Sequence, residues 1–446
     1  MSKKLWGGRF EKQIDKDFFE FEKSIHYDYK LAEYDIYQSR IHVDALKEGG
    51  LLTASEAKKI DTALYEILKE IEKGTFKPDM SAEDIHTDIH NRIEKKVGKL
   101  VLKFHTFRSR NEQIAFDTKY YCEIKAKSIL KLLSNLVLSF EYLSNKYNHV
   151  FIPGYTHTQR AQIISFKTYL GAFVVMFEKD KERIKKFLKD YYLYLGSGAL
   201  AGSPLSKQVY EKVVQKYKKI LSDSNIEIAD NPVENVSNRD FVIELLAIVA
   251  ILQMHLSRLS EDFILFSTKE FNYFNLPEEF CTGSSLMPHK KNPDFLELIR
   301  GYTGHVYGNL MSGLTIMKGL PLTYNRDMQL DKESLFSSIE IVEKELSLMA
   351  RFIKGIKLNE SKIDEALKDP NLYATEISQY LVYKGTPFQE AHAIVGEMVK
   401  YCIDNAIDMR SLNKETLRKF SNKFDRDVIK LFDPRVSVES KKSIKR

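Results

Sequence analysis

The chain has 446 residues, 43% of them hydrophobic and 29% charged, which is the composition of a soluble globular protein and excludes a disordered one. Its net charge of +6 comes from 68 Lys and Arg against 62 Asp and Glu, and the surplus is spread along the chain. Nucleic-acid binding usually shows a clustered basic face, so this charge argues against that class of protein and suits a small polyanionic substrate.

Cysteine usage and the apolar runs indicate the compartment. Cys122, Cys281 and Cys402 lie far apart without metal-ligand spacing, so a disulfide framework or a cysteine zinc site is not expected. The first ten residues lack the apolar core of a secretory signal. The longest apolar run, 245–252, is far shorter than the ~18 residues that span a bilayer. We therefore expect a cytoplasmic protein with no membrane partner.

Helical periodicity dominates the chain. Apolar residues recur at alternating three- and four-residue steps in 129–143, 166–177 and 241–259, the pattern of one buried stripe on a long helix. The last stretch predicts one helix over 240–268, about 43 Å long at ~1.5 Å per residue. No alternation of period two is sustained, so strands should be few and short. The sequence predicts an all-α fold with a long central helical bundle, made of helices long enough to favour oligomer contacts.

Breaks in this periodicity predict three domains. Residues 1–110 are expected to form an N-terminal helical domain with substrate-binding loops, and 111–355 the central bundle. The turn signals after residue 355 predict a small C-terminal helical domain over 356–446.

Residues 283–294 read Gly-Ser-Ser-Leu-Met-Pro-His-Lys-Lys-Asn-Pro-Asp. A serine hydroxyl beside Lys290 and Lys291 suits proton abstraction next to a carboxylate, because nearby cations stabilise both the alkoxide and the carbanion. The same residues also fit a plain helix start, with Asn292 as N-cap and Pro293 at the first helical position.

Two further segments carry donors and an acid/base group. His157, flanked by Thr156 and Thr158, is placed to act near neutral pH, although a lone histidine is often held only by capping groups. The segment 105–111 contains Arg108 and Arg110, which suit bidentate carboxylate binding, or else form a solvated basic loop.

One pattern favours a metal. His86 and His90 stand four apart, on one helix face, as in zinc hydrolases. Thr87 occupies the position where the zinc protease motif has its glutamate base, and no third ligand stands out. Helix-surface histidines with ordinary partners are the stronger interpretation, so no metal is expected.

Taken together, these segments resemble the argininosuccinate lyases of the fumarase/aspartase superfamily. The superfamily mark is the loop at 283–293, Gly-Ser-Ser-x-Met-Pro-x-Lys-x-Asn-Pro. The narrower marks are Leu-Trp-Gly-Gly-Arg-Phe at 5–10, then the segments 108–111, 156–162, 196–202, 237–241, 318–325 and 327–333. The resemblance runs over nearly the whole chain and implies a fumarase/aspartase-like fold.

The resemblance implies a cofactor-free, reversible elimination of argininosuccinate to arginine and fumarate, the reaction of arginine biosynthesis. It implies that Ser284 abstracts the proton and His157 is its acid/base partner, or that these two roles are exchanged. Glu297 then orients that histidine, and Lys290 stabilises the charged intermediate together with Asn292. The substrate-binding residues that the resemblance implies are Ser24, Arg110, Asn111, Thr156, Asn292, Tyr324, Gln329 and Lys332.

The resemblance also implies a homotetramer in which three chains build each active site. The near rivals are another fumarate-releasing lyase, such as an adenylosuccinate lyase, and a non-catalytic crystallin-like member of the family. The chain departs from the family at Phe107, usually Gly, at Glu112, usually Asp, at His289, usually Gln, and at His90, usually Glu. We expect these departures to alter affinity before they remove activity.

Overall fold

The computed structural model describes residues 12–221 and 224–443, so the segment 5–10 lies outside the described residues. The chain forms two compact units. Unit 1 comprises Met1–Leu132, Asp180–Met254 and Gly301–Glu345, and unit 2 comprises Leu133–Lys179, His255–Arg300 and Leu346–Arg446. This grouping does not test the three predicted domains, which stay a prediction.

Unit 1 contains a set of short helices and parts of the long ones. Its short elements are α1 (Lys16–Glu22), α2 (Ile25–Asp28), η1 (Tyr29–Leu31), α3 (Ala32–Glu48), α4 (Ala54–Glu72), α5 (Ile85–Val97), η2 (Gly98–Lys103), β3 (Tyr192–Leu195), α8 (Lys207–Ile220), β4 (Asn225–Ile228), α9 (Pro232–Ser237) and η4 (Arg326–Leu330). The long helices that contribute to it are α6 (Arg110–Lys146), α7 (Phe166–Lys189), α10 (Asp240–Ser267), α11 (Asp294–Met317) and α12 (Asp331–Gly355). The strands β3 and β4 pair in parallel.

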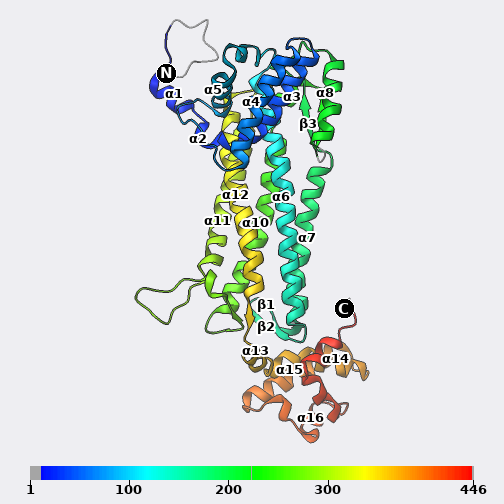
Figure 1. The fold of residues 1–446 in the computed structure, drawn as a ribbon. Helices are drawn as coiled ribbons and strands as arrows, with labels where there is room; N and C mark the ends of the chain where they lie inside the picture. Colours follow the sequence, from blue (N-terminus) through cyan, green and yellow to red (C-terminus); the bar gives the residue numbers. More distant parts are fainter. Residues whose placement is uncertain (1–11, 222–223, 444–446) are drawn as a thin grey trace. The chain divides into compact units, whose positions relative to one another are not determined.

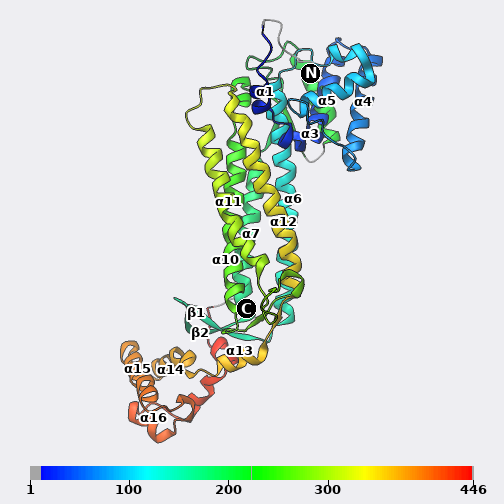
Figure 2. The ribbon, with the colours of Figure 1, turned by 90° about the vertical axis from the view of Figure 1, so that its left-hand side faces the viewer.

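The helices of unit 1 are held by apolar stripes and by local capping. Thr53 forms a capping box with Glu56 at the start of α4, which satisfies backbone N–H groups that the helix itself leaves unpaired. Tyr121 of α6 packs edge-on against Phe336 of α12, with ring centroids 4.7 Å apart. Figure 1 shows these two helices side by side, and Figure 2 shows the same from a second direction.

Unit 2 contains the remaining turns of the long helices and the C-terminal segment. Its other elements are β1 (Phe151–Thr156), β2 (Gln159–Ser165), β5 (Phe274–Asn275), η3 (Glu278–Phe280), β6 (Lys357–Leu358), α13 (Glu360–Leu367), η5 (Pro370–Tyr373), α14 (Ala374–Tyr383), α15 (Phe388–Asp404), η6 (Met409–Ser411), α16 (Lys414–Phe420), η7 (Arg426–Phe432) and α17 (Pro434–Glu439). β1 and β2 form an antiparallel hairpin, and β5 pairs antiparallel with β6.

Aromatic side chains fill the interior of the long helices in unit 2. Phe140 of α6 stacks with Phe173 of α7, which meets Phe263 of α10 edge-on. Phe263 in turn lies against Phe352 of α12. All four rings are buried, and such aromatic pairs add stability beyond the area that they bury.

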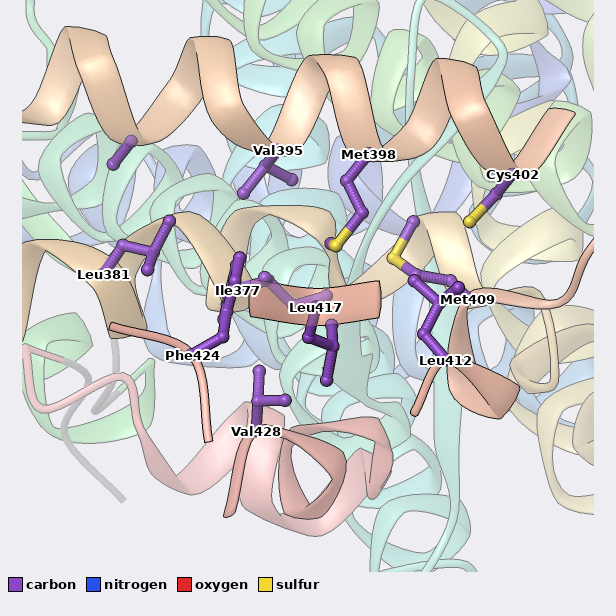
Figure 3. Close-up of a cluster of buried hydrophobic side chains, with 11 residues drawn as sticks. Ile377, Leu381, Val395, Met398, Cys402, Met409, Leu412, Leu417, Phe424 and Val428 are labelled. Atoms are coloured by element: carbon purple, nitrogen blue, oxygen red, sulfur yellow. The ribbon is translucent and has the colours of Figure 1, made fainter. Parts of the chain in front are cut away.

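The C-terminal helices have a core of their own. Figure 3 shows Val395, Met398 and Cys402 of α15 facing Ile377 and Leu381 of α14. Side chains from η6, α16 and the segment around η7 complete this cluster, and all its members are buried.

The predicted all-α class is confirmed, since the described strands form three two-stranded sheets of short strands. The helix predicted over 240–268 is α10, Asp240–Ser267. Among the described residues α10 is long and apolar enough to cross a membrane by length and composition alone. However, 56% of its most apolar stretch is buried inside the protein, as in the core helix of a soluble protein.

Candidate active site

A pocket of about 280 Å³ lies within unit 1, and four separate parts of the chain build it. These parts are the α1–α2 region, the start of α5, the start of α6, and the segment that runs through η4 into α12. Its lining residues are Phe19, Ser24, Asp28, Glu83, Asp84, His86, Thr87, Arg110, Asn111, Ile114, Tyr324, Arg326, Gln329 and Lys332. Six of the eight predicted substrate-binding residues are thus brought together: Ser24, Arg110, Asn111, Tyr324, Gln329 and Lys332.

The pocket carries charges of both signs. Arg110 is paired with Asp84, which also caps α5 by accepting the N–H of Thr87 at 2.7 Å. Burial opposes the charge on Asp84, but Arg110, His86 and the hydrogen bonds from Thr87 together outweigh burial and lower the pKa of this carboxyl. Lys332 is buried, and Nζ lies 2.6 Å from Oδ1 of Asp331. Burial lowers the pKa of Lys332 against the opposing pull of Asp331.

Asp28 is an acidic residue of the pocket that was not predicted from the sequence. Ser24 donates its hydroxyl to Oδ2 of Asp28 at 2.6 Å, and the N–H of Ile85 donates to Oδ1 at 3.0 Å. Burial first, and the charge of Asp84 second, raise the pKa of Asp28 to about 6. Ser24 is therefore held in place by a buried carboxyl at the pocket wall.

A buried polar cluster adjoins the pocket through His86. Nδ1 of His86 lies 3.4 Å from Asp35 and 3.7 Å from Asp117, and the ligand-type atoms of these three residues all fall within 4.8 Å of one another. Arg108 contacts Asp35 at 3.3 Å, so a cation already occupies one side of this group. Burial and the neighbouring Asp35 raise the pKa of Asp117 well above its usual range. The donor set fits a shared proton better than a metal ion, because an arginine beside the ligands opposes a second cation.

The prediction that His86 and His90 lie on the helix surface is wrong, because both histidines are buried. His86 faces Asp35 and Asp117, whereas Nδ1 of His90 lies 3.1 Å from Nε2 of His105. The two histidines of α5 therefore have separate partners, Asp35 of α3 and Asp117 of α6 for His86, and His105 for His90.

His157 lies in unit 2, at the turn of the β1–β2 hairpin. His157 and Thr158 have φ angles of 54° and 57°, which is the left-handed conformation that a two-residue hairpin turn requires. Thr156, the last residue of β1, pairs with Gln159. Thr156 and His157 are both exposed, so the hairpin presents the imidazole at its tip.

The loop that carries Ser284 is closed at its base and also lies in unit 2. Thr282 and Asn292 exchange backbone hydrogen bonds of 3.2 and 2.8 Å, and Nδ2 of Asn292 donates to the carbonyl of Gly283 at 3.4 Å. Oγ of Ser284 accepts the N–H groups of Met287 at 3.0 Å and Leu286 at 3.3 Å. Donors aimed at this oxygen stabilise a negative charge on it.

The remaining predicted catalytic residues are exposed. Lys290 lies on the same loop as Ser284, and Glu297 lies on the first turn of α11 with Nη2 of Arg300 4.0 Å away. The helix start predicted at Asn292 and Pro293 is displaced, since α11 begins at Asp294. Among the described residues no hydrogen bond joins His157 to Ser284, Lys290 or Glu297, so the structure does not itself join the acid/base pair.

Two of the four departures from the family pattern, Phe107 and Glu112, lie near the start of α6. Phe107 is exposed and has a φ of 59°, a conformation that strains a bulky residue. Glu112 is buried and accepts the backbone N–H groups of Gly196 at 2.9 Å and Gly198 at 2.6 Å. Burial raises the pKa of Glu112, although these two N–H groups pull it back. His289 is exposed on the Ser284 loop.

Comparisons of the sequence agree on one family. A family model described as lyase matches residues 8–308, and one described as argininosuccinate lyase C-terminal matches residues 371–439. The argininosuccinate lyase of Caldicellulosiruptor saccharolyticus is 41% identical over 441 residues, which covers 99% of this chain and 94% of that protein. The argininosuccinate lyase of Clostridium kluyveri is 42% identical over 432 residues, which covers 96% of this chain and 97% of that protein.

Solved structures share the fold at lower identity. The fumarate lyase:delta crystallin of Brucella melitensis superposes with a TM-score of 0.79 at 17% identity, covering 96% of this chain and 93% of that chain. EDDS lyase in complex with formate superposes with a TM-score of 0.76 at 22% identity, covering 95% of this chain and 84% of that chain. The class II fumarase of Schistosoma mansoni superposes with a TM-score of 0.76 at 17% identity, covering 91% of each chain.

Proposed function

We propose that this chain, which belongs to the argininosuccinate lyase family, catalyses the reversible elimination of argininosuccinate to L-arginine and fumarate, as in arginine biosynthesis. It is a carbon–nitrogen lyase, and the reaction is a general acid/base elimination. The observation that carries the substrate assignment is the full-length identity of 41–42% to curated argininosuccinate lyases.

The chemistry of the pocket supports the substrate class. Argininosuccinate carries three carboxylates together with a guanidinium and an amino group, so its site needs cations and anions side by side. Arg110 and Lys332 supply charge-assisted donors for carboxylates. Asp28 and Asp84 supply acceptors at the same pocket.

Ser284 is the proposed base. Removing a proton beside a carboxylate requires the serine oxygen to carry negative charge, and two backbone N–H groups already point at Oγ. Lys290 on the same loop adds a cation for the carbanion intermediate, and Asn292 adds an amide donor. His157 is the proposed partner that donates a proton to the departing nitrogen, with Glu297 as the carboxylate that orients it.

We propose that Thr156 and Asn292 complete the substrate contacts, and that a homotetramer assembles each site from three chains. Within unit 1, α11 leaves Tyr302, Tyr307, Met311 and Leu314 exposed, which is a large apolar face for one helix of a monomer. Mixing Ser284→Ala with Lys332→Gln tests this sharing. Activity that appears only after the two inactive variants are refolded together supports sites built from different chains, and a mixture that stays inactive contradicts them.

The substrate assignment is tested by offering argininosuccinate, adenylosuccinate, malate and aspartate separately and following fumarate by its ultraviolet absorbance. We expect release from argininosuccinate alone, by a cytoplasmic enzyme that needs no added cofactor. Release from adenylosuccinate would instead favour the adenylosuccinate lyase alternative. A folded protein that releases no fumarate would favour a crystallin-like, non-catalytic member.

A further inference from the structure

The glycine-rich loop Gly196–Gly202 of unit 1 has a closed and tightly determined shape. Gly196, Gly198 and Gly202 have φ angles of 84°, 56° and 90°, which L-residues rarely adopt. The N–H of Gly202 donates to the carbonyl of Ser197 at 2.9 Å and closes the loop on itself. A Cβ added at Gly198 would lie 2.3 Å from the carbonyl oxygen of Gly202, so the turn admits no side chain there.

Hydrogen bonds to buried side chains hold this loop in place. The carboxylate of Glu112 accepts two N–H groups of the loop, from Gly196 and Gly198, one on each oxygen. Nδ2 of Asn235 donates to the hydroxyl of Ser197 at 2.9 Å. Glu112, Asn235 and Ser197 are all buried, so water does not compete for these hydrogen bonds.

The Gly196–Gly202 loop also contacts a residue that lines the pocket. Nδ2 of Asn111 donates to the carbonyl of Ala199 at 3.3 Å, and Asn111 lines the pocket of unit 1. One hydrogen of that amide is thereby used, which leaves the other hydrogen and Oδ1 for a ligand. The direction in which the Asn111 amide presents these groups is therefore set by the position of Ala199.

We propose that Glu112 is a positioning residue for Asn111, acting through the backbone of the Gly196–Gly202 loop. Glu112 follows Asn111 directly in α6, yet its side chain acts on the loop that lies against the Asn111 amide. The inference deepens the proposed function, because it assigns to Glu112 the orientation of a substrate-contacting amide. It accounts for a carboxylate at this position, since each of its two oxygens accepts one of the two N–H groups.

A double-mutant cycle tests this route. Glu112→Gln replaces one oxygen by an NH₂ group that faces a backbone N–H, so KM for argininosuccinate should rise by about tenfold while kcat changes less. Asn111→Ala should raise KM by a similar factor. If Glu112 acts through Asn111, the double variant should show no further rise over Asn111→Ala.

Three further measurements separate positioning from plain structural support. Glu112→Asp keeps the carboxylate and should restore most of the affinity, whereas a purely packing role would favour the longer Gln. Gly198→Ala distorts the same loop without touching Glu112 and should reproduce the rise in KM, which keeps the test available if Glu112→Gln does not fold. Hydrogen exchange in the 196–203 segment should be faster in Glu112→Gln, and this result does not depend on turnover.

KM effects that multiply in the double variant would overturn the inference, as would a Glu112→Gln protein with unchanged KM and unchanged exchange. Failure of the proposed function has a different signature, because the wild-type protein would then release no fumarate from argininosuccinate. In that case the cycle is measured with the substrate that the wild-type protein turns over. If it turns over none, unchanged exchange in Glu112→Gln overturns the link between Glu112 and the loop.

Discussion

Nε of Arg239 lies 3.0 Å from Oδ2 of Asp331, and both side chains are buried within unit 1. The other oxygen of Asp331 holds Nζ of Lys332, so two cations share one carboxylate at the wall of the pocket. The arrangement has a clear consequence for stability, because a buried ion whose partner is removed keeps its desolvation cost.

Arg239→Ala should lower the free energy of unfolding by about 3–5 kcal/mol, the usual cost of breaking a buried ion pair from one side. Chemical denaturation of the variant and the wild-type protein measures this difference. Arg410→Ala is the matched control, because Arg410 pairs with Asp408 at 2.5 Å on the surface and should lose less than about 1 kcal/mol. Equal losses of unfolding free energy in the two variants would contradict the claim that burial makes the Arg239–Asp331 pair the more costly one to break.

Ser284→Ala should keep its fold and lose turnover by a factor of about 10²–10⁴, the range that general acid/base groups contribute. Binding of argininosuccinate should persist, since the predicted substrate contacts remain. Ser285→Ala is the control, because it removes a neighbouring hydroxyl from the same loop and should retain most of the activity. Similar rates in all three proteins would remove Ser284 from the mechanism.

Glu345 makes stability depend on pH. This carboxyl is buried on α12 near Gln253 of α10, and burial raises its pKa to about 8. An acid whose folded pKa lies above its unfolded value binds more protons when folded, so its contribution is fully present below about pH 4.5 and falls as pH rises to about 8. The slope in that window is about 1.4 kcal/mol per pH unit.

Glu345→Gln removes this titration, so it should stabilise the protein more at pH 8 than at pH 5. Unfolding midpoints at the two pH values measure the effect, and Glu390→Gln, which removes an exposed carboxylate of α15, is the control. A gain that is the same at both pH values would show that Glu345 does not titrate in the folded protein over this range.

The sequence predicted the long helices well because their signal is local and repeated. The stripe from Ile129 to Leu143 is buried in α6, and α10 ends within one residue of its predicted limit. These features depend on hydrophobic period, which a short window of sequence contains.

The pocket could not be assembled in the same way. Asp28, Asp84 and Lys332 come from segments separated by dozens to hundreds of residues, and only the packing of α2, α5 and α12 brings them to one pocket. The resemblance to a family supplied six pocket residues but not the acidic ones. His86 and His90 were misplaced on a helix surface because periodicity alone does not say which face of a short helix is buried.

The most direct test of the central claim is to incubate the purified protein with argininosuccinate and quantify both products in the same sample over time. An argininosuccinate lyase should release fumarate and arginine in equal amounts, and adding both products together should regenerate argininosuccinate. Fumarate without arginine, or no product from a folded protein, would contradict the assignment.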